Sequence, residues 1–123
     1  MFYYQSVPYK DSNELPTEFD SREQWPDLIT PVRDQAACGG CWAFAISEVI
    51  GDRLGALGCS RGVMSPQDLI SCDSLDAGCN GGNFDTAWDW ATENGITTDE
   101  CITFKSTKGK VPQCPETCDN KSD

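Results

Sequence analysis

The sequence contains no histidine among its 123 residues. Histidine is the side chain that most often transfers protons in catalysis near neutral pH, and it is also the commonest metal ligand. A nucleophilic side chain in this chain would therefore need a base from another source. The same absence argues against a structural zinc site, because only one Cys-x-x-C pair is present and no histidine could join it.

Positive charge is also scarce. The chain has nine lysines and arginines and twenty aspartates and glutamates, which gives a net charge of −11 and a pI of about 4.2. Because binding to phosphate backbones requires basic patches, we expect no nucleic-acid partner. No apolar run is long enough to cross a bilayer, so we expect no membrane span. No internal repeat is visible, and the length fits one domain.

Cysteine, by contrast, is abundant. Eight cysteines in a short acidic chain indicate an oxidising compartment and a disulfide framework. Only 38% of the residues are apolar, so we expect cross-links to support a modest core. Eight cysteines allow 105 complete pairings, and spacing alone does not choose among them.

The most informative stretch runs from Gln35 to Phe44 and contains Cys38 and Cys41, separated by two glycines. An apolar pattern with helical spacing starts directly behind Cys41. The second thiol therefore lies in the first turn of a predicted helix, where unpaired backbone N–H groups and the positive end of the helix dipole favour a thiolate. The glycines leave room for another chain to approach.

Periodicity and capping signals predict three helices. Apolar residues recur at helical spacing, and glycines follow the first and third helices. Ser65 has the side chain of an N-cap, Pro66 fits the first helical position, and Asp68 lies where the partner of a capping box belongs. The expected helices span about residues 40–54, a segment that begins at Ser65, and residues 84–94.

The other segments are expected to be irregular. We interpret residues 1–14 as an irregular arm and residues 15–35 as extended chain, because three prolines oppose a helix there. Beyond Gly95, glycines and prolines indicate loops. Three tryptophans are interpreted as core residues, and they are Trp25, Trp88 and Trp90.

The stretch around Cys41 resembles the nucleophile segment of the papain-like cysteine proteases, whose local signature is Cys-Gly-Ser/Ala-Cys-Trp. Gly40 departs from that signature, and Ala36 stands where the family usually has glycine. Residues 15–22 resemble the start of a mature enzyme of this family. On this basis residues 1–14 would be a propeptide remnant.

A Cys-Asn-Gly-Gly run that begins at Cys79 resembles a loop of the same family. The cysteines near the C-terminus, Cys101, Cys114 and Cys118, resemble the cathepsin B branch. The resemblance implies three disulfides and leaves Cys41 and Cys59 unpaired. The implied pairs are Cys38–Cys79, Cys72–Cys114 and Cys101–Cys118.

The resemblance also implies roles for individual residues. Cys41 would attack the scissile carbonyl as a thiolate, and Gln35 would stabilise the oxyanion together with the backbone N–H of Cys41. Gly81 and Gly82 would pair with the substrate backbone like an added strand. No cofactor and no metal are implied. The implied substrate-binding residues are Gly39, Gly40, Trp42, Gly81, Gly82 and Phe84.

The resemblance runs from Leu15 to Cys118 but does not include the catalytic base. In this family the histidine and asparagine that complete the site lie about 130–150 residues after the nucleophile, whereas 82 residues follow Cys41. We therefore expect residues 15–123 to form the left, mainly α half of a papain-like α+β fold, stapled by disulfides. The right half, which carries the base, would be a separate or missing part.

The implied function is that of a cysteine endopeptidase, present here as a fragment that is inactive alone. Cathepsin B carries a long, histidine-bearing loop that grips the C-terminal carboxylate of a substrate. Here twelve residues separate Cys101 from Cys114, and none is a histidine. An uncapped cleft admits a chain on both sides, which favours endopeptidase activity over release of dipeptides.

The resemblance implies partners and a compartment as well. The partners would be peptide or protein substrates, the right half, and a propeptide or protein inhibitors. The compartment would be part of the secretory pathway, either lysosome-like or vacuolar, or the protein would be secreted.

Three alternatives stay open at this point. Cys38 and Cys41 could form a thioredoxin-type redox pair, although the tryptophan follows the pair and no βαβ pattern surrounds it. The cysteines could bind structural zinc. The chain could also be a catalytically inactive homologue that acts as a binding module, which the lack of histidine favours.

Overall fold

The computed structural model describes residues 15–120, so the interpretation of residues 1–14 as an arm or propeptide remnant lies outside the described residues. The fold is mainly helical, as predicted, and within residues 15–120 the only pairing of β type is an isolated antiparallel bridge between Met64 and Thr98. No described helix is long and apolar enough to span a bilayer. The helices are α1 (Ser21–Gln24), α2 (Cys41–Ala56), α3 (Pro66–Cys72), the 3₁₀ helix η2 (Gly78–Asn80) and α4 (Phe84–Asn94).

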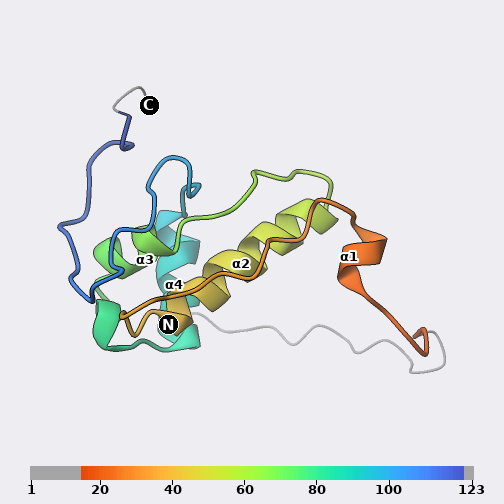
Figure 1. Ribbon diagram of the computed structural model, residues 1–123, viewed down its shortest axis with the longest axis horizontal. Coiled ribbons are helices and arrows are strands. Elements are labelled where there is room, and N and C mark those ends of the chain that lie inside the picture. The colour runs from red at the N-terminus through yellow and green to blue at the C-terminus, as the bar shows by residue number, and fades with distance from the viewer. Residues whose placement is uncertain (1–14, 121–123) are drawn as a thin grey trace.

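Helix α2 is the centre of the structure. Helices α3 and α4 both pack against it, and the chain that precedes it runs along its length toward α1 (Figure 1). The close approach of this preceding chain depends on Gly55, because a Cβ there would lie 2.6 Å from the carbonyl oxygen of Leu28. The buried residues of the core cluster are Cys38, Trp42, Ala43, Ile46, Leu69, Ile70 and Ala87.

Helix α2 ends slightly later than the glycine pattern predicts. Gly55 lies inside the helix, where it contacts Leu28, and does not end it. The left-handed turn comes at Gly58, with φ of 81°, and the N–H of Cys59 then donates to the carbonyl oxygen of Leu54 at 3.0 Å. Glycine is suited to such a turn because it has no Cβ.

The cap of α3 also connects the helix to a distant segment. The Ser65 hydroxyl accepts from the N–H of Asp68 at 3.0 Å, as predicted. The other half of the expected capping box is absent, because the Ser65 N–H donates to the carbonyl oxygen of Thr97. The Asp68 carboxylate accepts from the Thr97 N–H at 2.9 Å instead. The N-terminus of α3 is therefore fixed to the chain that follows α4.

Two expectations for residues 15–35 are wrong. One turn of helix, α1, forms between two prolines because the Asp20 side chain caps it by accepting from the Arg22 N–H at 2.9 Å. Trp25 is only half-buried and lies outside the core cluster, with its ring edge-on to the exposed ring of Phe19. Trp88 and Trp90, in contrast, pack against the core as expected.

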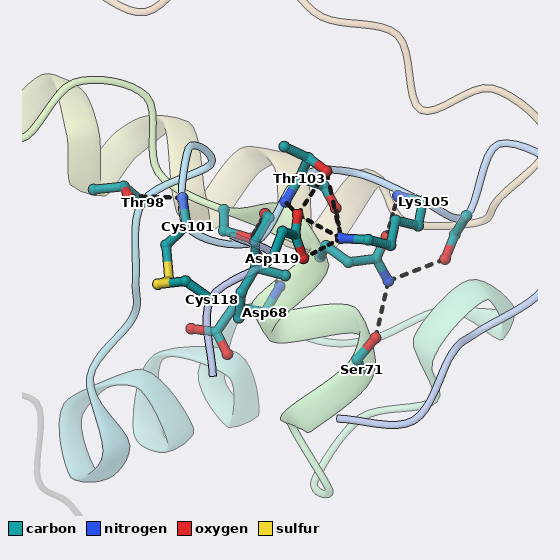
Figure 2. Close-up of polar contacts among 12 residues, drawn as sticks. Asp68, Ser71, Thr98, Cys101, Thr103, Lys105, Cys118 and Asp119 are labelled. Atoms are coloured by element: carbon teal, nitrogen blue, oxygen red, sulfur yellow. Dashed lines mark hydrogen bonds and ion pairs between the residues drawn. A yellow bond between two sulfur atoms is a disulfide. The ribbon is translucent and has the colours of Figure 1, made fainter. Parts of the chain in front are cut away.

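The loop-rich chain after Gly95 is held by side chains. The buried Gln67 accepts from the Lys105 N–H at 2.7 Å and donates to the hydroxyls of Ser71 and Ser106. Lys105 forms an ion pair with Asp119, whose carboxylate also accepts from Thr103 (Figure 2). These hydrogen bonds, with Lys105 as the largest cause, lower the pKa of Asp119 to about 2. The structure also contains the disulfides Cys72–Cys114 and Cys101–Cys118, the same pairs that the resemblance implies.

Candidate active site

Cys41 is the first residue of α2, and its side chain is exposed and unpaired. Gly40 occupies the N-cap and has no side chain that could bond to the first turn. The first N–H groups of a helix have no acceptor within the helix, and the positive end of its dipole lies there. Helix α2 therefore presents the Cys41 thiol at an end that attracts negative charge.

Two glycine pairs lie side by side next to Cys41. The disulfide Cys38–Cys79 joins their segments, and the Gly39 N–H donates to the carbonyl oxygen of Cys79 at 2.9 Å. A Cβ on Gly39 would lie 2.5 Å from that same oxygen. A Cβ on the buried Gly40 would lie 2.9 Å from the Cδ1 of Ile70. The backbone contact therefore requires glycine at position 39, whereas a Cβ at position 40 would force the Ile70 side chain to move.

The second glycine pair, Gly81 and Gly82, packs on Trp42. The Trp42 side chain is buried, with 2% of the residue exposed, and its Nε1–H donates to the carbonyl oxygen of Gly78 at 3.0 Å. A Cβ on Gly82 would lie 2.5 Å from the Cδ2 of this ring. The expectation that Trp42 contacts substrate needs correction, because the ring lies beneath the glycine loop and supports it.

The surface of this loop is open. Gly81 has φ of 117°, a conformation that favours glycine, and its carbonyl oxygen accepts from the Ala77 N–H at 2.9 Å. Among residues 15–120 the N–H and C=O of Gly82 have no hydrogen-bond partner. Phe84, at the start of α4, is 59% exposed beside them. An extended peptide could pair with such a backbone edge.

Cys41 and Gln35 line the same open cleft, which has a volume of about 650 Å³. Sequence reasoning missed two charged residues there, Arg33 and Glu48. The Nη1 of Arg33 is 3.2 Å from the Oδ1 of Asp99, and its guanidinium lies over the Phe44 ring. Burial raises the pKa of Glu48, while Arg33 acts to lower it and Asp52 to raise it. Glu48 lies two helical turns after Cys41, and this spacing could have placed it on the same face of the predicted helix. No sequence pattern indicated that Arg33 lies in the cleft.

The loop that carries Gln35 has a strained residue. Asp34 accepts from the Ala36 N–H at 2.7 Å, and Ala36 has φ of 54°. The next residue, Ala37, donates its N–H to the carbonyl oxygen of Thr107 at 3.1 Å. The position where the papain-like pattern has glycine thus adopts the conformation for which glycine is suited.

The geometry also bears on the alternatives. Cys38 is bonded to Cys79, so it does not form a redox pair with Cys41 in this structure. Within residues 15–120 no group of three or more His, Cys, Asp or Glu side chains could hold a metal ion. The acidic residue beside Gln35, Asp34, already uses one oxygen to hold the Ala36 turn. A base for Cys41 is not evident in the described part of the chain.

Comparisons with known proteins agree on one family. The model of the papain family of cysteine proteases matches residues 15–123. The chain is 40% identical over 113 residues to the cathepsin B-like CP2 of Giardia intestinalis, which covers 89% of this chain and 38% of that protein. It is also 40% identical over 107 residues to a human protein named tubulointerstitial nephritis antigen-like, which covers 81% of this chain and 23% of that protein.

A solved structure with a similar fold is the procathepsin B S9 of Trypanosoma congolense. The TM-score is 0.84 at 33% identity, and the match covers 95% of this chain and 44% of that one. The chain thus spans less than half the length of the relatives that it matches.

Substitution of Ala36 by glycine is expected to stabilise the fold. The left-handed conformation costs alanine about 1–2 kcal/mol. Glycine avoids this strain, but it lowers the free energy of unfolding by about 0.4–1 kcal/mol because the unfolded chain has more conformational freedom. The matched control is Ala37→Gly, since Ala37 does not have a positive φ and only loses stability. Urea unfolding with disulfides intact should rank Ala36→Gly above the parent chain and Ala37→Gly below it. Equal destabilisation by both variants would show that the Ala36 turn is not strained.

Proposed function

Because the chain belongs to the papain family of cysteine proteases, in its cathepsin B-like branch, we propose that it provides the nucleophile of a cysteine endopeptidase. The observation that carries the proposal is the exposed Cys41 thiol at the start of α2, in one cleft with Gln35. The open Gly81–Gly82 backbone lies on the segment that the Cys38–Cys79 disulfide joins to this site.

The proposed chemistry is thiolate attack on a peptide carbonyl. The Sγ of Cys41 bonds to the carbonyl carbon, and the oxyanion receives hydrogen bonds from the Gln35 amide and the Cys41 backbone N–H. The C–N bond then breaks, the amine leaves with a proton from a histidine, and water releases the acid from the thioester. That histidine is not in this sequence and would come from a right half of the domain.

The proposed division of the chain follows from this chemistry. Residues 15–123 would be the left half of the catalytic domain, and a right half would cover the cleft wall at Cys41. The side chain of Val32, which lines this cleft, is 100% exposed and would gain burial there. Substrates would be peptides or proteins, with Gly82 pairing to their backbone and Phe84 beside it.

Further partners and a compartment are part of the same proposal. Two structural neighbours were solved in their proforms, and we propose that a propeptide or protein inhibitor occupies the cleft at Cys41 in this protein. The three disulfides suit an oxidising compartment. We assign the protein to the secretory pathway, in a lysosome-like or vacuolar compartment or outside the cell.

The second candidate is an inactive homologue that acts as a binding module. The specific observation in its favour is the absence of histidine from the sequence. The same cleft and glycine loop would then bind a peptide without cleaving it. The two candidates differ in whether addition of a histidine-bearing right half produces hydrolysis that depends on Cys41.

This chain alone is expected not to hydrolyse peptides. Proton transfer by a positioned base contributes about 10²–10⁴-fold to such reactions, and no imidazole is present. A peptidase assay of the purified chain, with the Cys41→Ala variant as blank, should show equal background for both. Turnover that disappears in the variant would show that another residue acts as the base.

The same chain offers an internal comparison of its two free thiols. Cys41 starts α2, whereas Cys59 follows its C-terminal end, and both are exposed. The positive end of the α2 dipole lies at Cys41, and Cys59 lies beyond its negative end. Iodoacetamide should therefore alkylate the Cys59→Ser variant faster than the Cys41→Ser variant. The reverse order would contradict the assignment of Cys41 as nucleophile.

A complete protein that contains this chain is expected to cleave within chains. Twelve residues join Cys101 to Cys114 without a histidine, and this segment packs on the backbone of Ala37 through Gly109 while Cys41 stays exposed. Products from a model peptide should therefore be internal fragments, as read by mass spectrometry over time. Dominant stepwise loss of C-terminal dipeptides would contradict an uncapped cleft.

A further inference from the structure

Two carboxyl groups lie at the base of the loop that carries Gly81 and Gly82. Asp73 is the C-cap of α3 and is 4% exposed, and its Oδ1 accepts from the Leu75 N–H at 2.8 Å. Asp76 is half-buried, and its Oδ1 accepts from the Asn83 N–H at 2.8 Å and from the Thr86 hydroxyl at 2.6 Å. Asp76 therefore joins the start of the loop to its end.

The second oxygens of both carboxyl groups are buried without another partner. Neither the Oδ2 of Asp73 nor the Oδ2 of Asp76 accepts a hydrogen bond from any donor group of the described residues. Two carboxylates offer only acceptors, so they can bond to each other only if one of them keeps a proton. A buried acceptor without a donor is unfavourable, and a shared proton removes that cost.

We propose that Asp73 and Asp76 share one proton, and that this O–H···O bond positions the Gly81–Gly82 backbone. The positioning role rests on the proposed function, in which the Gly81–Gly82 backbone pairs with substrate. The loop is closed from both sides, because Asp76 holds the Asn83 N–H while the Ala77 N–H donates to the carbonyl oxygen of Gly81 at 2.9 Å. A second negative charge on the pair would push these two attachment points apart.

The titration directions agree with this geometry. Burial, then the hydrogen bond with Asp76, raises the pKa of Asp73 to about 7. Burial also acts to raise the pKa of Asp76, but hydrogen bonds from Asp73, Thr86 and Asn83 hold it below the usual value. Two carboxyl groups that share a site lose their protons in two separated steps.

Among residues 15–120 no cation compensates the second charge of this pair. Within that range Asp76 is the only charged group that shifts the pKa of Asp73, and Asp73 is the only one that shifts the pKa of Asp76. From α4 the nearby titratable group is Asp85, whose carboxylate accepts from the Thr86 N–H. From α3, Asp68 bonds to Thr97, and η2 has no free titratable side chain. Lys110 precedes the Val111 side chain that contacts Gly78, and it shifts neither carboxyl.

The sign of the pH dependence follows from these directions. The contribution of Asp73 is fully present below its unfolded pKa of 3.8 and is lost as the pH rises toward about 7. The contribution of Asp76 is present above 3.8 and is lost only as the pH falls through its lowered value. Between pH 5 and 6.5 the folded loop holds one proton more than the opened loop, so the closing equilibrium should fall about tenfold per pH unit.

The first test is a carboxyl ¹³C titration of the oxidised 123-residue chain from pH 3 to 9. We expect the Asp73 signal to have a midpoint near 7 and the Asp76 signal to respond to the same step. If both carboxyls titrate completely below pH 5, the shared proton does not exist. This measurement does not involve peptide hydrolysis, so it stands or falls independently of the proposed function.

The second test is amide hydrogen exchange at Leu75, Ala77 and Asn83, corrected for the intrinsic effect of pH. Protection should fall about tenfold per pH unit between pH 5 and 6.5 in the parent chain. In Asp73→Asn the amide can donate permanently to Asp76, so protection there should not change with pH. The matched control is Glu93→Gln, which removes an exposed carboxylate of α4 and should keep the parental slope.

The outcomes separate positioning from ordinary structural support. A merely structural carboxylate at Asp73 would leave the three amides independent of pH in the parent chain, and that result overturns the proposal. An unchanged slope in Asp73→Asn would also overturn it. If this variant does not fold, the carboxyl titration of the parent chain decides the matter alone.

Discussion

The structure depends on the covalent joint between Cys38 and Cys79. This disulfide closes 41 residues of sequence separation, and bridges of this kind typically contribute about 2–4 kcal/mol. It is reinforced by the hydrogen bond from Gly39 to the carbonyl oxygen of Cys79. Because Gly39 allows no Cβ there, the segment before Cys41 and the 3₁₀ helix that precedes Gly81 are held as one unit.

Much of this arrangement could be predicted from local sequence. Apolar periodicity and capping residues predicted the three main helices. The helical pattern that begins directly after the two glycines also predicted that Cys41 lies at the start of a helix. The short helix α1 was missed because a single Asp20 cap suffices for one turn between prolines. Trp25 was misplaced because burial of an aromatic residue depends on what packs against it, and among residues 15–120 its only aromatic partner is the exposed ring of Phe19.

The remainder depends on contacts between distant positions. Nothing local indicates that Trp42 lies under Gly82, or that Asp68 bonds to Thr97 in place of completing its own cap. The same limit applies to the cleft, where Arg33 forms an ion pair with Asp99, 66 residues further along the chain. Side-chain contacts across more than twenty residues leave no periodic signal in the sequence, so only three-dimensional packing reveals them.

The Cys38–Cys79 disulfide holds the two glycine segments together at Cys41. Hydrogen exchange at the Gly39 amide tests it most directly, since this N–H donates to the Cys79 carbonyl. In the double variant Cys38→Ser with Cys79→Ser, protection of the Gly39 amide should be lost. In the matched double variant Cys101→Ser with Cys118→Ser it should persist. Full protection of Gly39 in the first variant would contradict the account.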